Sequence, residues 1–215
     1  SRGLFNTSGV ALAPRARDGK KTRIHAFFSH PEKPGRYPAV LDLHGAGLGK
    51  LSPDAGIAYA TNGFACLTID WCGPTPARQP PYSEFDSPGN MHVQVKDTNG
   101  VPIRGKYTCN PETSAMRNGV LFVRRSVQFL KSRPEVDADR LCIAGASAGA
   151  FLTLLSIGHE PAFKAAVVKY GCGFITMPAY RFGGYVIGVT LCPRDQQEAW
   201  AASFDSKHRL NQVKA

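Results

Sequence analysis

The most constraining feature of this chain is the pentapeptide Gly145-Ala146-Ser147-Ala148-Gly149. Residues 140–144 before it are mostly apolar and predict a strand, and residues 149–157 after it predict a helix. A serine on so sharp a turn needs small neighbours, because adjacent segments pass close to its backbone. The turn would raise the hydroxyl above the sheet edge and aim the N–H of Ala148 at a developing oxyanion. The pattern therefore predicts Ser147 as a nucleophile and Ala148 as an oxyanion-hole donor; the alternative is a serine that only caps the helix.

A second landmark is the glycine-rich stretch His44-Gly45-Ala46-Gly47-Leu48-Gly49, directly after a buried-strand pattern at 38–43. It has neither the P-loop spacing nor the dinucleotide-binding G-x-G-x-x-G spacing. Together with the serine turn it is better interpreted as an oxyanion loop, with the N–H of Ala46 as the second donor. We expect His44 to be structural, because it precedes the serine in the chain whereas the general base of such a site follows it.

Strand and helix patterns alternate along most of the chain, which predicts a mostly parallel sheet with helices on both faces, a three-layer α/β sandwich. Residues 22–29 predict a strand of an early hairpin that pairs with 9–12. The other expected strands are 38–43, 64–69, 140–144 and 164–170, and the expected helices are 53–61, 114–133 and 149–157.

One segment interrupts this alternation. Residues 71–112 hold seven of the sixteen prolines and show no sustained period, so we expect a loop excursion above the sheet. This excursion and residues 174–194 are expected to shape the substrate pocket.

Composition narrows the class of protein. A chain of 215 residues with 43% hydrophobic residues fits a single globular domain, and it has no apolar stretch long enough to span a bilayer. No signal peptide is visible, which leaves a cytoplasmic protein or a secreted or periplasmic one after signal removal. The net charge of +10 is scattered, so no nucleic-acid partner is expected, and the cysteines lack metal-ligand spacing.

These landmarks resemble the α/β-hydrolase superfamily, and most nearly its acetylxylan esterase, dienelactone hydrolase and prolyl-oligopeptidase-like branches. The matching residues are 37–45, Asp70, the 145–149 pentapeptide and 170–174. The resemblance implies an eight-stranded sheet, a Ser-His-Asp triad and hydrolysis of esters or other acyl bonds, with no cofactor or metal.

The C-terminal part departs from that family pattern. Only 45 residues follow Tyr170, and in such hydrolases the acid and the histidine follow further strands. We therefore expect a domain that lacks its C-terminal strands together with the acid and the base. The competing account is a compact triad in which Asp195 is the acid and His208 the base.

The function expected from these residues is hydrolysis of carboxylic esters, including acetyl or other acyl groups on carbohydrate, through an acyl-enzyme on Ser147. The substrate would be a small-molecule or carbohydrate ester, with no membrane partner. The alternatives are a serine peptidase of the prolyl-oligopeptidase type and a non-catalytic, hydrolase-like binding protein or fragment. Labelling of the serine by a fluorophosphonate separates the enzymes from the binding protein.

Overall fold

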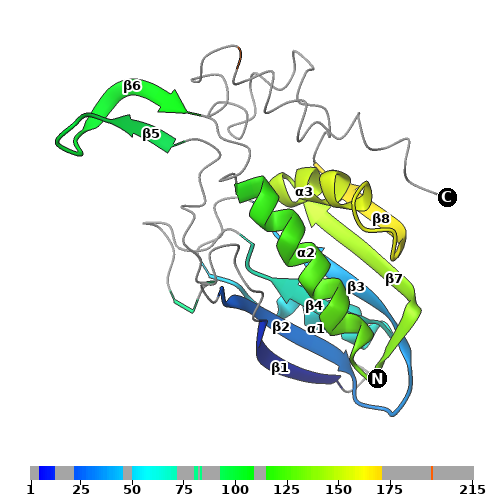
Figure 1. The fold of residues 1–215 in the computed structure, drawn as a ribbon. Helices are drawn as coiled ribbons and strands as arrows, with labels where there is room; N and C mark the ends of the chain where they lie inside the picture. Colours follow the sequence, from blue (N-terminus) through cyan, green and yellow to red (C-terminus); the bar gives the residue numbers. More distant parts are fainter. Residues whose placement is uncertain are drawn as a thin grey trace.

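The computed structural model describes residues 5–12, 22–45, 50–71, 80–81, 83, 93–108, 115–170 and 195. Within these ranges the chain forms strands and helices in alternation, as expected (Figure 1). The strands are β1 Phe5–Leu12, β2 Ile24–Pro31, β3 Tyr37–Leu43, β4 Ala65–Ile69, β5 Val93–Lys96, β6 Pro102–Thr108, β7 Val136–Ala146 and β8 Phe163–Lys169. The helices are α1 Asp54–Thr61, α2 Ala115–Lys131 and α3 Ala148–Ile157.

Six strands form one sheet in the order β1-β2-β4-β3-β7-β8. β1 pairs antiparallel with β2, with Gly9 opposite Phe27, so the predicted early hairpin is confirmed. β2 is also antiparallel to β4, and the remaining neighbours, β4-β3-β7-β8, are parallel. The carboxyl ends of β3, β4 and β7 therefore meet at one edge, where α/β sheets bind their ligands.

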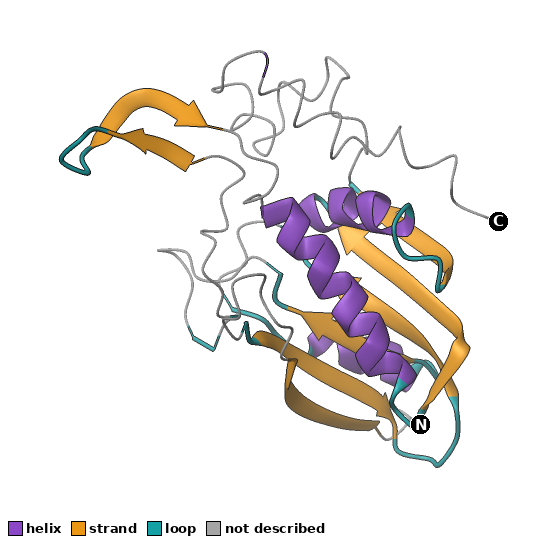
Figure 2. Ribbon diagram, in the orientation of Figure 1, coloured by secondary structure: helices purple, strands orange, loops and turns teal. Residues whose placement is uncertain are grey.

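Helices cover both faces of this sheet (Figure 2). α1 lies against one face, where a β-carbon on Gly56 would be 2.7 Å from the hydroxyl oxygen of Ser29. α2 and α3 share the other face, on which Phe129 of α2 packs edge-on against Phe28 of β2 with 5.5 Å between ring centroids. The predicted three-layer sandwich with a mostly parallel sheet is thus confirmed.

The central strands are buried because they lie between the two helical layers. β4 is fully buried along its length, and β3 buries its apolar residues on both faces. Continuous apolar runs of this kind are typical of parallel strands covered on both sides. The fully buried large side chains are Trp71, Phe28, Ile24, Leu41, Leu43, Leu67, Ile69, Leu130, Leu141 and Ile143.

The excursion holds a hairpin that the sequence analysis did not predict. β5 and β6 pair antiparallel and stand apart from the main sheet in Figure 1. Their turn is closed by Asp97, whose side chain accepts from the N–H groups of Asn99 and Val101 at 2.9 and 2.8 Å. Gly100 takes a φ of +80° there, as glycine does readily. The Asp-Thr-Asn-Gly sequence after Val-Gln-Val-Lys was the signal for this turn.

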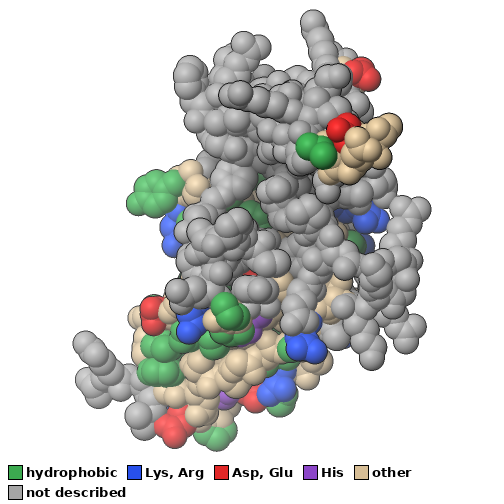
Figure 3. Space-filling model, turned by 90° about the vertical axis from the view of Figure 1, so that its left-hand side faces the viewer, with side chains coloured by type: hydrophobic (Ala, Val, Ile, Leu, Met, Phe, Trp, Pro, Cys, Tyr) green, Lys and Arg blue, Asp and Glu red, His purple; other side chains and the backbone are tan. Residues whose placement is uncertain are grey.

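The distribution of basic side chains on the surface agrees with the expectation that the net positive charge is scattered. On the face in Figure 3, the Lys and Arg side chains of the described residues are separated by other residue types rather than gathered in a stripe. None of the described helices combines the length and the apolarity needed to cross a membrane.

Candidate active site

Ser147 forms the turn between β7 and α3, as the pentapeptide predicted. Its backbone has φ 53° and ψ −113°, a left-handed conformation that residues with a side chain rarely adopt. Strained backbone of this kind is found mostly at functional sites. The residue is exposed, whereas Ala148 after it is buried as the first residue of α3.

The two glycines of the pentapeptide allow backbone segments to touch. A β-carbon on Gly145 would overlap the carbonyl group of Gly149, and one on Gly149 would overlap the carbonyl of Leu43. The hydroxyl of Thr153 donates to the carbonyl of Gly149 at 2.8 Å and closes the first turn of the helix. Only glycine fits at these two positions, because both clashes are with backbone atoms.

A backbone hydrogen bond fixes the turn to the next strand. The N–H of Ser147 donates to the carbonyl of Lys169 at 2.8 Å, where β8 ends beside β7. Tyr170 follows with a φ of 56° and is 96% exposed. The strained serine is therefore anchored on its N–H side by the end of β8.

The predicted oxyanion loop begins beside this turn. A β-carbon on Gly45 would lie 3.3 Å from the carbonyl oxygen of Ala146 and 3.4 Å from Cβ of Ser147. The structure thus brings together His44, Gly45 and Ser147, which lie about 100 residues apart in the sequence. Ala46, the predicted donor of this loop, lies outside the described residues.

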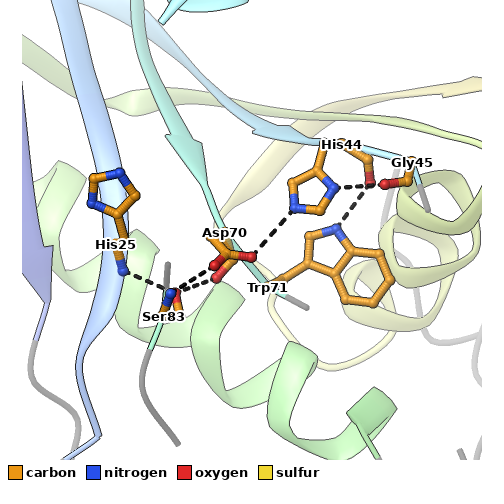
Figure 4. A network of polar contacts seen from close by, with 6 residues as sticks. All are labelled: His25, His44, Gly45, Asp70, Trp71 and Ser83. Atoms are coloured by element: carbon orange, nitrogen blue, oxygen red, sulfur yellow. Dashed lines mark hydrogen bonds and ion pairs between the residues drawn. The ribbon is translucent and has the colours of Figure 1, made fainter. Parts of the chain in front are cut away.

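His44 sits in a buried polar network at the ends of β3 and β4 (Figure 4). Its Nδ1 lies 2.6 Å from the carbonyl oxygen of Gly45, and its Nε2 faces Oδ1 of Asp70 at 3.6 Å. The ring stacks on Trp71 with 5.5 Å between centroids, and the indole N–H of Trp71 donates to the carbonyl of His44 at 2.9 Å. The prediction that His44 is structural agrees with these contacts.

Asp70 is fully buried and is the centre of that network. Its Oδ2 accepts from the N–H of Ser83 at 2.6 Å, and its carbonyl accepts from the Ser83 hydroxyl at 2.6 Å. The N–H of His25 donates to the same hydroxyl at 2.8 Å, which connects β2 to the network. Sequence reasoning marked Asp70 only as the end of a strand and missed Ser83; an acidic residue directly after a buried strand was the available signal.

Besides Asp70, a second ionisable group, Asp42 of β3, lies on the face of the sheet that α1 covers. Burial raises the pKa of Asp42, and the positive charges of Lys169 and His44 oppose that effect. Burial likewise raises the pKa of the Cys66 thiol, with the Asp42 charge as a smaller cause. Cys66 is therefore a packed, unreactive thiol rather than a nucleophile.

The acid and base of a triad are not among the groups gathered here. Asp195 is described and exposed, but His208 lies outside the described residues. Among the described histidines, His25 and His30 belong to β2 and His159 follows the end of α3, as expected. Within the described ranges no group of three or more His, Cys, Asp or Glu side chains could hold a metal ion.

Several known proteins are similar to this chain in sequence or in fold. Residues 17–176 match the acetyl xylan esterase (AXE1) family. Acetyl esterase Axe7A of Xylanibacter ruminicola is 27% identical over 170 residues, which cover 77% of this chain and 37% of that protein. Acyl-coenzyme A thioesterase 1 of Mus musculus is 28% identical over 167 residues, covering 78% of this chain and 30% of its own length.

A solved structure agrees with the fold. The acetyl xylan esterase from Paenibacillus sp. R4 superposes with a TM-score of 0.64 at 21% identity, covering 100% of this chain and 72% of that one. The chain spans 37% and 30% of the lengths of the two curated relatives above. Because the family match covers most of the chain, including the glycine-rich stretch after β3 and the serine turn, this chain belongs to the acetyl xylan esterase family and has the α/β-hydrolase fold.

Proposed function

We propose that this chain is an α/β-hydrolase domain that carries the nucleophile of a serine esterase, with carboxylic esters such as acetylated carbohydrates as substrates. The observation that carries the proposal is the position of Ser147, strained and exposed, beside Gly45 at the carboxyl edge of the sheet. Membership of the acetyl xylan esterase family supports the acyl class of substrate.

In the proposed reaction, Oγ of Ser147 attacks the acyl carbon while a histidine removes its proton. The N–H groups of Ala46 and Ala148 stabilise the tetrahedral oxyanion, and each such donor contributes roughly 100- to 1,000-fold in rate. Collapse expels the alcohol, which takes the proton back from the histidine, and water then releases the acid from the acyl-enzyme. We propose that the base and the acid come from sequence after Tyr170, with His208 and Asp195 as the candidates within this chain.

A second candidate substrate is a thioester of coenzyme A. The match to acyl-coenzyme A thioesterases supports it, and the net charge of +10 would attract the polyanionic coenzyme. The same serine attack would apply, with a thiolate as the leaving group instead of an alkoxide.

The test compares the S147A variant with the wild-type protein, and both are produced from the whole gene. Substrates are p-nitrophenyl acetate, an acetylated xylo-oligosaccharide and acetyl-coenzyme A, and fluorophosphonate labelling is located by mass spectrometry. We expect labelling of Ser147 and loss of turnover in S147A. The control is S132A, which removes an exposed hydroxyl at the end of α2.

Each outcome decides between the hypotheses. Turnover that survives in S147A means that another group is the nucleophile. A wild-type protein that neither labels nor turns over any ester favours the non-catalytic binding protein. The ratio of kcat/KM for the oxygen esters and the thioester selects the substrate class.

A further inference from the structure

We propose that Tyr170 is a specificity-determining residue that stacks its phenol ring on the alcohol part of the ester, a sugar ring or an aryl group. The inference rests on the proposed function and names the part of the substrate that this side chain recognises. Its basis is the juxtaposition of two residues with a strained backbone, Ser147 and Tyr170, at the ends of neighbouring strands.

The two residues lie at the same level of the sheet. β7 and β8 pair in parallel with Ala146 opposite Lys169, and Ser147 and Tyr170 are the next residues along the two strands. The N–H of Ser147 donates to the carbonyl of Lys169 at 2.8 Å, and that carbonyl belongs to the peptide that joins Lys169 to Tyr170. Tyr170 is therefore linked to the serine turn through one peptide group, at the edge where α/β sheets bind their ligands.

The backbone at both positions is left-handed. Ser147 has φ 53° and Tyr170 has φ 56°, and within the described ranges no other residue except glycine has a positive φ. This conformation costs free energy for any residue with a β-carbon, and glycine would avoid the cost. Strain of this kind is found mostly at active sites and ligand clamps, so its presence next to the proposed nucleophile favours a role for the tyrosine side chain.

Packing does not explain why a tyrosine occupies this position. Its side chain is 96% exposed, more than any other large hydrophobic residue in the described part of the chain. A ring this exposed buries almost no apolar area on folding, so burial does not offset the strain of its backbone. The ring is therefore available to a ligand that binds beside Ser147.

The exposure of the ring also indicates which part of the substrate it contacts. The acyl carbon has to reach Oγ of Ser147, whereas a side chain in solvent reaches the part of the ester that stays outside the turn. For an acetyl ester that part is the alcohol, because the acetyl group is small and ends at the attacked carbon. A phenol offers a flat apolar face and a hydroxyl group, which suit a sugar ring or an aryl ring.

The test compares Y170A, which removes the ring, with Y170F, which keeps it, in protein produced from the whole gene. The substrates are an acetylated xylo-oligosaccharide and phenyl acetate, which carry a ring on the alcohol, and methyl acetate, which does not. We expect Y170A to raise KM about 3- to 10-fold for the two ring-bearing esters, as for the loss of one aromatic contact. KM for methyl acetate and kcat for all three should stay within about twofold, because stacking is made equally in the ground state and the transition state.

Two further variants separate the ring from its backbone. Y170F should match wild type on all three esters, and Y170G, which also relieves the positive φ, should match Y170A. The control is F5A, which removes a partly exposed ring from β1 at the opposite edge of the sheet. An equal change of KM for all three esters in Y170A, or a wild-type KM for the ring-bearing esters, would overturn the stacking role.

A binding measurement distinguishes failure of this inference from failure of the proposed function. S147A and the double variant S147A/Y170A are titrated with the acetylated xylo-oligosaccharide by calorimetry, and we expect Kd to be about 3- to 10-fold higher in the double variant. Equal Kd values would overturn the role of Tyr170, whichever group is the nucleophile. Turnover that persists in S147A would overturn only the esterase proposal.

Discussion

The carbonyl oxygen of His44 lies 2.6 Å from the place that a β-carbon would occupy on Gly149. The backbone just after β3 and the start of α3 therefore touch. The indole N–H of Trp71 donates to the same carbonyl at 2.9 Å, so this oxygen has little room to move away from an added methyl group.

Gly149→Ala should consequently destabilise the protein by roughly 1–3 kcal/mol, the usual cost of inserting a methyl group into a packed site. Gly9→Ala is the control, because a β-carbon at Gly9 would meet nothing within 4 Å. Urea unfolding of both variants checks the difference. Equal stability of the two would mean that the close approach at Gly149 is relieved at no cost.

The strain at Ser147 predicts a stability difference between two inactive variants. S147G removes the side chain that disfavours φ 53°, whereas S147A keeps a β-carbon there. We expect S147G to be the more stable of the two by about 1 kcal/mol, as measured by thermal unfolding. A more stable S147A would show that the turn stores no such strain.

The raised pKa of Asp42 predicts a pH-dependent stability. A carboxyl group whose pKa is raised by folding binds its proton more tightly in the folded state. Its contribution to stability is therefore full below the unfolded pKa of about 3.9, and it is lost as the pH rises through the folded pKa. Asp42→Asn, neutral throughout, should stabilise the protein at pH 7 relative to wild type and lose that advantage toward pH 4.

The control for this experiment is Asp139→Asn, at an exposed carboxylate on β7. Its stability relative to wild type should change little between the same two pH values. An Asp42→Asn variant that is less stable than wild type at neutral pH would show that the attraction of Lys169 and His44 outweighs burial.

Asp70 should tolerate asparagine better than alanine. The amide oxygen of Asp70→Asn can accept from the N–H of Ser83 as the carboxylate does, and the amide keeps a polar group facing Nε2 of His44. We expect Asp70→Asn to keep kcat within about tenfold. Asp70→Ala leaves the buried N–H of Ser83 without this acceptor and should lose about 1–3 kcal/mol in unfolding free energy. Urea unfolding of both variants checks this difference. An equal loss of unfolding free energy in Asp70→Asn and Asp70→Ala would contradict a hydrogen-bonding role.

Local patterns predicted the elements that build the centre of the fold. The apolar runs of β3 and β4 are stable as parallel strands that are covered on both faces. The small residues around Ser147 are stable as a sharp turn. β7 begins earlier than expected, at Val136, because Tyr37 pairs with that residue across a register irregularity. Such pairing depends on a distant strand and leaves no periodic signal in residues 136–139.

The polar network could not be predicted in the same way. Asp70 and Ser83 are 13 residues apart, and their contact depends on a chain path through a segment without a sequence period. The contacts of the His44 side chain with Asp70 and Trp71 likewise form only because β3 and β4 end side by side. Residues that act through tertiary hydrogen bonds are recognised once the strand order is known.

The hydrogen bond from the N–H of Ser147 to the carbonyl of Lys169 has a consequence for protein engineering. The pentapeptide depends on β8 for this acceptor and on the end of β3 for the backbone that lies against Gly149. A short peptide of the same sequence lacks both supports, so nothing in it holds the serine backbone at a positive φ. Grafting this turn onto another scaffold therefore requires three adjacent parallel strands with matching ends, so the smallest transferable unit is a section of sheet rather than a sequence motif.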